Sequence, residues 1–233
     1  MEERNLDLVP RKEGTREKVT PVMIKFQLDE IKQHFDENVQ YIRAQFKIAD
    51  EMLQLRKEDD AKTIWRSQIV FVESAFDFYL HEITKYGLSE MFTGGWEKTE
   101  KYNNLSVKMS IVDKALNARE DTEWFIEFVN DFYKEKTLVS YESVKDQMNL
   151  LGLNIQEVAD GVFYERGSDV KTKEKLKNSL EGLYHRRNII AHQSGRRHSD
   201  AQLEEISKEL VESHLEDVEK VVQKIHELAE QNG

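Results

Sequence analysis

Proline is confined to the start of this chain of 233 residues, at Pro10 and Pro21. Proline inside a helix removes a backbone hydrogen bond and clashes with the preceding turn, so its absence after Pro21 leaves the rest of the chain open to helix formation. Apolar residues there recur at intervals of three and four, and no segment shows the strict alternation typical of a strand. The sequence therefore predicts an all-α fold.

Two long helices are expected in the first half of the chain. Between residues 22 and 55 the apolar positions form the stripe of an amphipathic helix, as in a coiled coil, with Asn38 in one of the apolar positions. Asn38 could set the register against a partner helix or be a tolerated polar residue. Residues 61–86 are apolar nearly all round, which is typical of a central buried helix, and the pair Gly94 and Gly95 indicates a connection after it.

Shorter helices follow, and one of them carries the most basic segment of the chain. The remaining pattern predicts helices at residues 105–117, 122–136, 141–150, 155–163, 170–192 and 200–230. Ser168 or Asp169 could cap the fifth of these helices, and Gly195 suits the loop that ends it. We expect residues 1–20 to form a flexible arm and residues 21–233 to form one helical domain.

Composition restricts the class of protein. The chain has no cysteine, which excludes a disulfide framework, a catalytic thiol and any cysteine-ligated zinc site. Its N-terminus lacks the apolar segment of a secretory signal, and no run approaches the stretch of about 18 apolar residues that a membrane span needs. We therefore expect a soluble cytoplasmic protein with no membrane contact. The net charge of −11 argues against nonspecific binding to long nucleic acid, because such binding draws on a broad basic surface.

The segment HRRNIIAHQSGRRH, residues 185–198, gathers positive charge within this acidic chain. It contains four arginines and three histidines and no acidic residue. On a helical wheel, Arg187 falls in the middle of an apolar stripe, where a charge is costly unless it is paired or solvated in a cleft. Either the helix end leaves the core there and Arg187 reaches water, or Arg187 faces a cleft. Glu73 and Asp77, four apart on the buried helix, could pair with an arginine of this segment or be ordinary carboxylates at the edge of the core.

The residues of this segment do not all share one face of a helix. Asn188 and His192 are neighbours on one flank, but Arg187 and His192 lie about 140° apart on an ideal helix. Either the helix distorts at its end or each site combines residues from two protomers. His185 and His192, seven residues apart, also line up. Two imidazoles without a nearby carboxylate make a poor metal site, so we expect no metal and no other cofactor.

The sequence RRNIIAH resembles the R-x4–6-H signature of the HEPN superfamily in its common form, Arg-Asn-x-x-x-His. Arg187 matches the arginine, Asn188 the polar residue after it and His192 the histidine. The segments FVESAFDFYLHEI and GRRHSDAQLEEISKELVESHLEDVEKVVQKI are similar to the RiboL-PSP-HEPN branch, so the resemblance covers most of residues 60–230, with Arg-x4-His as its specific part. It implies a HEPN-like helical bundle that forms a homodimer and brings two motifs into one cleft.

Many members of this family are metal-independent endoribonucleases of bacterial or archaeal defence and toxin–antitoxin systems, and the resemblance implies this function here. RNA supplies its own nucleophile, the 2′-OH, so the enzyme moves protons and stabilises charge on phosphorus. His192 would act as general acid and base, Arg187 would bind phosphate oxygens, and Asn188 would orient His192 or the substrate. The residues that would contact the RNA backbone are Arg186, Arg196, Arg197 and His198. The further candidates for a supporting role are His185, Glu73 and Asp77.

Two other functions stay open at this point. Other HEPN proteins bind a nucleotide or a protein partner, such as an antitoxin or an effector subunit, without cleaving anything. A purely structural dimeric bundle could instead use its arginine cluster to dock an acidic partner. The intact set of Arg187, Asn188 and His192 favours catalysis.

Overall fold

The computed structural model describes residues 25–117 and 123–232. The arm predicted at residues 1–20 lies outside these residues. Within them regular secondary structure is helical, with one isolated bridge between Arg196 and Leu203, so the prediction of an all-α fold is confirmed. The helices of the described residues are α1 (Leu28–Gln54), α2 (Glu58–Thr93), α3 (Glu100–Asn103), α4 (Met109–Asn117), α5 (Glu123–Tyr133), α6 (Tyr141–Leu151), α7 (Ile155–Phe163), α8 (Thr172–Gln193) and α9 (Lys208–Gln231).

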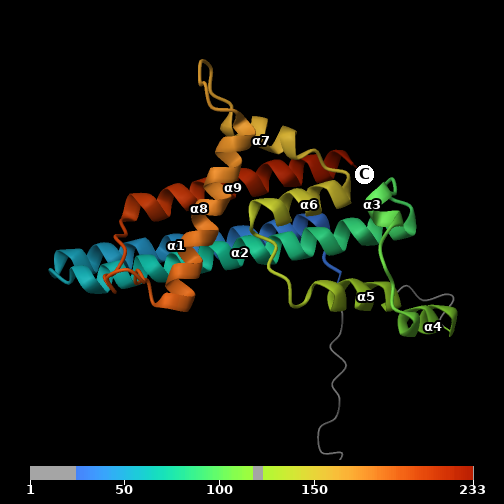
Figure 1. The fold of residues 1–233 in the computed structure, drawn as a ribbon, viewed down its shortest axis with the longest axis horizontal. Helices are drawn as coiled ribbons and strands as arrows, with labels where there is room; N and C mark the ends of the chain where they lie inside the picture. The colour runs from blue at the N-terminus through green and yellow to red at the C-terminus, as the bar shows by residue number, and fades with distance from the viewer. Residues whose placement is uncertain (1–24, 118–122, 233) are drawn as a thin grey trace, which may run out of the picture.

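α1 and α2 form a long antiparallel hairpin against which the other helices pack (Figure 1). α9 runs along the hairpin, and α8 crosses α2 steeply, with α7 at its upper end. α5 and α6 cover other parts of α2. α2 is therefore the central helix, as its nearly continuous apolar sequence predicts, and Phe76, Tyr79 and Leu80 in its middle are fully buried.

α1 buries one stripe and begins later than the periodicity predicts. Its buried residues are Ile31, Phe35, Val39, Ile42, Phe46 and Ala49. The helix begins at Leu28 rather than at residue 22, because Gln27 and Glu30 form a capping box in which the amide of Gln27 donates to the Glu30 carboxylate at 2.7 Å. Asn38 lies beside the buried stripe, at an open groove between α1 and α2.

α2 is longer than predicted at both ends. It begins at Glu58, and the three acidic residues in its first turn stabilise this start because they lie at the positive end of the helix dipole. It continues past residue 86 because Gly87 does not break the helix: a Cβ atom at Gly87 would lie 2.6 Å from the side chains of Leu151 and Trp96. The glycine is therefore required by close packing. Gly94, with a φ angle of 89°, ends the helix.

The ends of α8 and α9 also differ from the prediction. α8 begins at Thr172 after Lys171, and neither Ser168 nor Asp169 caps it. Gly195 lies in the loop after α8, as predicted, with a φ angle of 75°. α9 begins at Lys208 rather than at residue 200, because Ser207 is its N-cap and accepts a hydrogen bond from the third amide of the helix.

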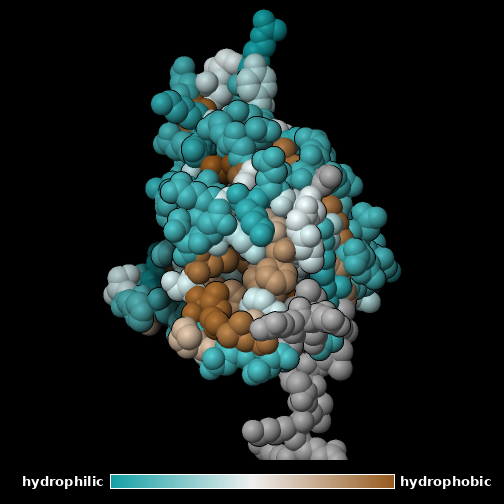
Figure 2. Space-filling view, turned by 90° about the vertical axis from the view of Figure 1, so that its right-hand side faces the viewer, coloured by the Kyte–Doolittle hydropathy of each residue, from teal (hydrophilic) through white to brown (hydrophobic). Residues whose placement is uncertain are grey.

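One end of the molecule, where α3, α4 and α5 lie, exposes apolar side chains. Figure 2 shows hydrophobic residues gathered on the lower half of this end. α4 packs on α5 and leaves Met109 and Leu116 largely exposed. Within residues 25–117 and 123–232, no helix combines the length and the apolarity that crossing a bilayer demands.

Candidate functional site

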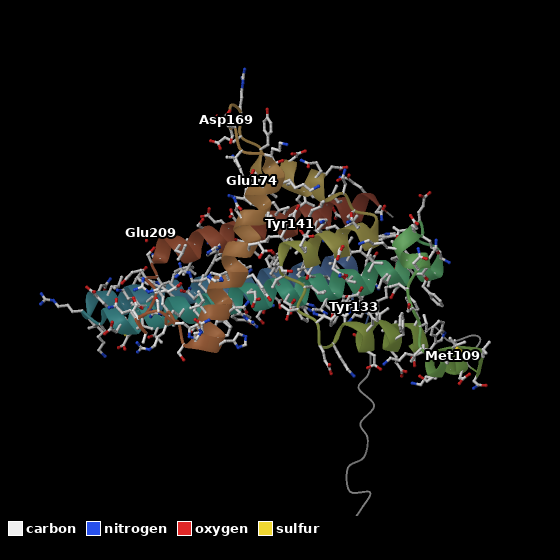
Figure 3. The ribbon with its side chains drawn as sticks, in the orientation of Figure 1. Met109, Tyr133, Tyr141, Asp169, Glu174 and Glu209 are labelled. Carbon is white, nitrogen blue, oxygen red and sulfur yellow. The ribbon has the colours of Figure 1, made fainter. Side chains whose placement is uncertain are left out.

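The C-terminal half of α8 carries the basic segment, and the rest of the helix anchors it. The first half of α8 buries an apolar stripe of Leu176, Leu180 and Leu183. Tyr141, at the start of α6, lies beside α8 (Figure 3), and its amide donates a hydrogen bond to the Glu181 carboxylate at 3.1 Å. These contacts fix the angle at which α8 crosses α2.

Arg187 is paired with a buried carboxylate of α2. The Nε atom of Arg187 lies 2.5 Å from Oε2 of Glu73. The Glu73 side chain is only 2 % exposed, whereas that of Arg187 is 28 % exposed. One of the two carboxylates considered from the sequence thus pairs with the arginine in the apolar stripe. Arg187 is neither buried alone nor released into water.

Burial and the charge of Arg187 shift the pKa of the Glu73 carboxyl group in opposite directions. Burial raises its pKa from 4.5 to about 7, which outweighs the lowering by the positive charge of Arg187, and the negative charge of Asp77 adds a smaller increase. The Oε1 atom of Glu73 is buried and has no hydrogen-bond partner among the described residues. The carboxyl group of Glu73 therefore exchanges its proton near neutral pH.

Asn188 contacts Arg187, whereas His192 stands apart from both. Nη1 of Arg187 donates a hydrogen bond to Oδ1 of Asn188 at 3.0 Å. His192 is exposed and forms no hydrogen bond or ion pair with any residue that the structure describes. α8 stays helical through Gln193, so a distorted helix end does not bring Arg187 and His192 together.

The other arginines of the segment hold the loop between α8 and α9. Each of them has a partner within the chain. The contacts join Arg186 to the Glu205 carbonyl at 2.8 Å, Arg196 to the Ala201 carbonyl at 2.7 Å and Arg197 to the Asp200 carboxylate at 2.7 Å. His198, next to them, is exposed. An RNA phosphate that contacted these arginines would therefore share or replace an existing partner.

Asp77 and His185 lie outside the group around Arg187. Oδ1 of Asp77 accepts a hydrogen bond from the Leu138 amide at 2.7 Å, and Oδ2 lies 3.7 Å from His81. Asp77 thus fixes the chain before α6 and does not pair with an arginine. His185 is exposed on α8. The structure groups Glu73, Arg187 and Asn188, and it leaves the histidines of the segment accessible.

A different group of side chains could hold a metal ion, where the start of α1 meets the end of α9. Asp29, His226 and Glu230 each place one ligand atom within 4.8 Å of the others. The spacing of His226 and Glu230 on one helix is readable from the sequence, but only the fold adds Asp29. Among the described residues, no such group of three includes His185 or His192.

Comparison with family models, with curated proteins and with solved structures finds no match to this chain. The likeness to HEPN proteins therefore depends on the motif and its helical surroundings.

Proposed function

We propose that the chain is a metal-independent endoribonuclease of the HEPN type, which acts as a homodimer in a prokaryotic defence or toxin–antitoxin system. The observation that carries this proposal is the guanidinium of Arg187, held by Glu73 and Asn188 on the helix that also bears His192. Donors that are oriented before the substrate binds need no reorganisation as charge develops in the transition state.

Arg187 is suited to stabilising charge on phosphorus. Its Nε atom faces Glu73 and its Nη1 atom donates to Asn188. The Nη2 atom makes no hydrogen bond with the described residues, so it is left to donate to a phosphate oxygen. In this scheme Glu73 is a positioning residue, because it touches Arg187 and does not touch the RNA.

His192 is suited to the proton transfers. Cleavage requires removal of the 2′-OH proton while the 2′-oxygen bonds to phosphorus, and it requires a proton for the departing 5′-oxygen. The products are a 2′,3′-cyclic phosphate and a 5′-OH. An accessible imidazole can serve either step near neutral pH. Because Arg187 and His192 of one copy lie on different sides of α8, we place His192 of one copy opposite Arg187 of the other.

A second candidate is a HEPN module that binds a nucleotide or a protein partner without cleaving RNA. The intrachain contacts of Arg186, Arg196 and Arg197 favour it, because engaged arginines leave less positive charge for a long RNA. A compact nucleotide needs fewer such contacts, and the net charge of −11 penalises it less.

Incubation of the untagged chain with tRNA and with mRNA in the presence of EDTA tests the proposal. We expect cleavage in EDTA and products that end in a 2′,3′-cyclic phosphate or a 3′-phosphate. A 2′-deoxy nucleotide at the cut position should block cleavage. Loss of activity in EDTA, or cleavage of the deoxy substrate, would contradict the proposed chemistry. Nucleotide binding without any cleavage would support the second candidate.

A further inference from the structure

The first turn of α1 meets the last turns of α9 in a small group of histidine and carboxylate side chains. α9 packs against α1 and runs antiparallel to it, so the end of one helix lies beside the start of the other (Figure 1). Asp29 comes from α1, and His226 and Glu230 come from α9. Their ligand atoms all lie within 4.8 Å of one another, and no other three such side chains gather as closely in the described part of the chain.

His226 is the fixed member of this group. Its side chain is only 9 % exposed, and it makes no hydrogen bond with the residues that the structure describes. Its Nε2 atom points at both carboxylates, 3.9 Å from Oδ1 of Asp29 and 3.6 Å from Oε1 of Glu230. A buried polar side chain without a hydrogen bond is rare in folded proteins, so the position of this imidazole requires an explanation.

A protonated imidazole between two carboxylates does not explain this geometry. Charge-assisted hydrogen bonds from nitrogen to a carboxylate are about 2.7–2.9 Å long, and both distances from Nε2 are well above this range. Burial also lowers the pKa of His226 from its ordinary value of 6.5 and outweighs the opposing charge of Glu230. The ring is therefore neutral at pH 7, which is the form that binds a metal ion.

The spacing of the three groups instead fits a metal ion between them. At zinc–ligand distances of about 2.1 Å, two ligand atoms of a tetrahedral site lie about 3.4 Å apart. The distances from Nε2 to the two carboxylate oxygens are slightly longer, so a small movement of each carboxylate would close the site. The side chains of Asp29 and Glu230 are 93 % and 53 % exposed, which leaves them free to make this movement.

We infer that Asp29, His226 and Glu230 bind a divalent transition-metal ion, and that Zn²⁺ suits the ligand set best. Mg²⁺ and Ca²⁺ take oxygen ligands, whereas Zn²⁺ binds imidazole together with carboxylates. His226 and Glu230 are four residues apart on one helix, which places both side chains on the same face. Zn²⁺ takes four ligands, and a water molecule completes the set.

The bound ion ties the first turn of α1 to the last turns of α9. These are helix ends, which fray more readily than helix interiors, and an ion that binds only the folded chain stabilises it by mass action. None of the three ligands belongs to α8, which carries Arg187 and His192. The ion therefore stabilises the fold and takes no part in cleavage, and the inference does not depend on the proposed function.

Calorimetric titration of the untagged full chain with Zn²⁺, after EDTA has been removed by dialysis, tests the site. The wild type should bind one Zn²⁺ per chain with micromolar or tighter affinity. Glu230→Gln and Asp29→Asn should each weaken this binding by roughly 10–100-fold or more, since replacing a group that only supports a metal ligand already costs this much. Glu227→Gln is the matched control: it removes the same charge from the same helix, but Glu227 pairs with Lys224, and the variant should bind like the wild type.

Thermal unfolding gives a second measurement. Zn²⁺ at about a hundredfold of its dissociation constant should raise the unfolding temperature of the wild type by roughly 5–10 °C and leave that of Glu230→Gln nearly unchanged. Without Zn²⁺ the two proteins should unfold at similar temperatures, because the Glu230 side chain is 53 % exposed. A wild type that binds no Zn²⁺, or Asp29→Asn and Glu230→Gln variants that bind it as tightly as the wild type, would overturn the inference. Cleavage in EDTA tests the proposed function separately, because the metal-free chain keeps Arg187 and His192.

Discussion

Glu73 and Arg187 face each other where α2 and α8 cross, in surroundings that disfavour an isolated charge. Glu73 is almost fully buried, and its pKa of about 7 lies well above the ordinary value because burial outweighs the attraction of Arg187. Breaking a buried pair by removing one partner is more costly than replacing both, because the remaining group stays buried. Stability and the orientation of Arg187 are therefore linked through this pair.

The Glu73→Gln variant should remove a pH dependence from the free energy of unfolding. The folded-state pKa of about 7 lies above the value of 4.5 expected in the unfolded chain, so the folded state binds the proton more tightly. This contribution is fully present below the unfolded pKa and is lost as the pH rises through the folded pKa. Between about pH 4 and about pH 8 the wild type should therefore lose about 3 kcal/mol relative to Glu73→Gln. Urea unfolding at several pH values measures this, and parallel curves for the two proteins would contradict it.

Substitutions at Arg187 and His192 should separate catalysis from stability. His192→Ala should lower cleavage by roughly 10²–10⁴-fold, because the proton carrier is lost, and should leave the unfolding free energy unchanged, because His192 is exposed. Arg187→Ala should lower cleavage as well but destabilise the fold by roughly 3 kcal/mol near pH 8, because it leaves Glu73 unpaired.

Adding Glu73→Gln to Arg187→Ala should restore most of that stability without restoring cleavage. Full activity of His192→Ala would remove the catalytic assignment. An Arg187→Ala protein as stable as the wild type near pH 8 would show that the pair with Glu73 contributes nothing to the free energy of unfolding.

At the scale of helices, local pattern predicts interiors better than ends. α7 has the predicted bounds, because both of its ends are set by local signals: Asn154 caps its start and a loop follows its end. The end of α2 was not predictable, because Gly87 is required by contacts with Trp96 and Leu151, which lie elsewhere in the chain. The late start of α9 has a similar cause, since the loop before it is held by Arg186 of α8 and by Arg196 of the loop itself.

The residues of the candidate site were predictable from the sequence, but most of their contacts were not. Arg187 can be singled out because it interrupts an apolar stripe, and Glu73 and Asp77 because they are carboxylates on a helix that is apolar nearly all round. The choice between Glu73 and Asp77 depends on the angle at which α8 crosses α2, which no helical wheel contains. The intrachain partners of Arg196 and Arg197 arise from a loop without periodicity, and the pattern gave no sign of them.

Two glycines within helices should respond to the same substitution in opposite ways. Gly87→Ala should destabilise the fold by roughly 1–3 kcal/mol, because the added methyl group would lie 2.6 Å from Leu151 and Trp96. Gly182→Ala on α8 should stabilise it by about 1 kcal/mol, because the nearest atom, on His214, is at an ordinary 3.6 Å and alanine favours the helix. Thermal unfolding measures both, and a shift of the same sign in the two variants would contradict the packing argument.

At the scale of the whole molecule, an acidic body with one basic segment favours a localised site over a broad nucleic-acid surface. The net charge of −11 repels RNA except near residues 185–198, where arginines and histidines gather.

Mixing two inactive variants should restore activity if each site takes Arg187 from one copy and His192 from the other. A dimer of His192→Ala with Arg187→Ala then has one site with both residues intact and one site with neither. With random exchange of subunits about half of the dimers are mixed, so the mixture should recover roughly a quarter of the wild-type rate. The rate is measured on the cleaved RNA after the proteins are incubated together long enough to exchange. If Arg187 and His192 of the same copy formed the site, every mixture would stay inactive.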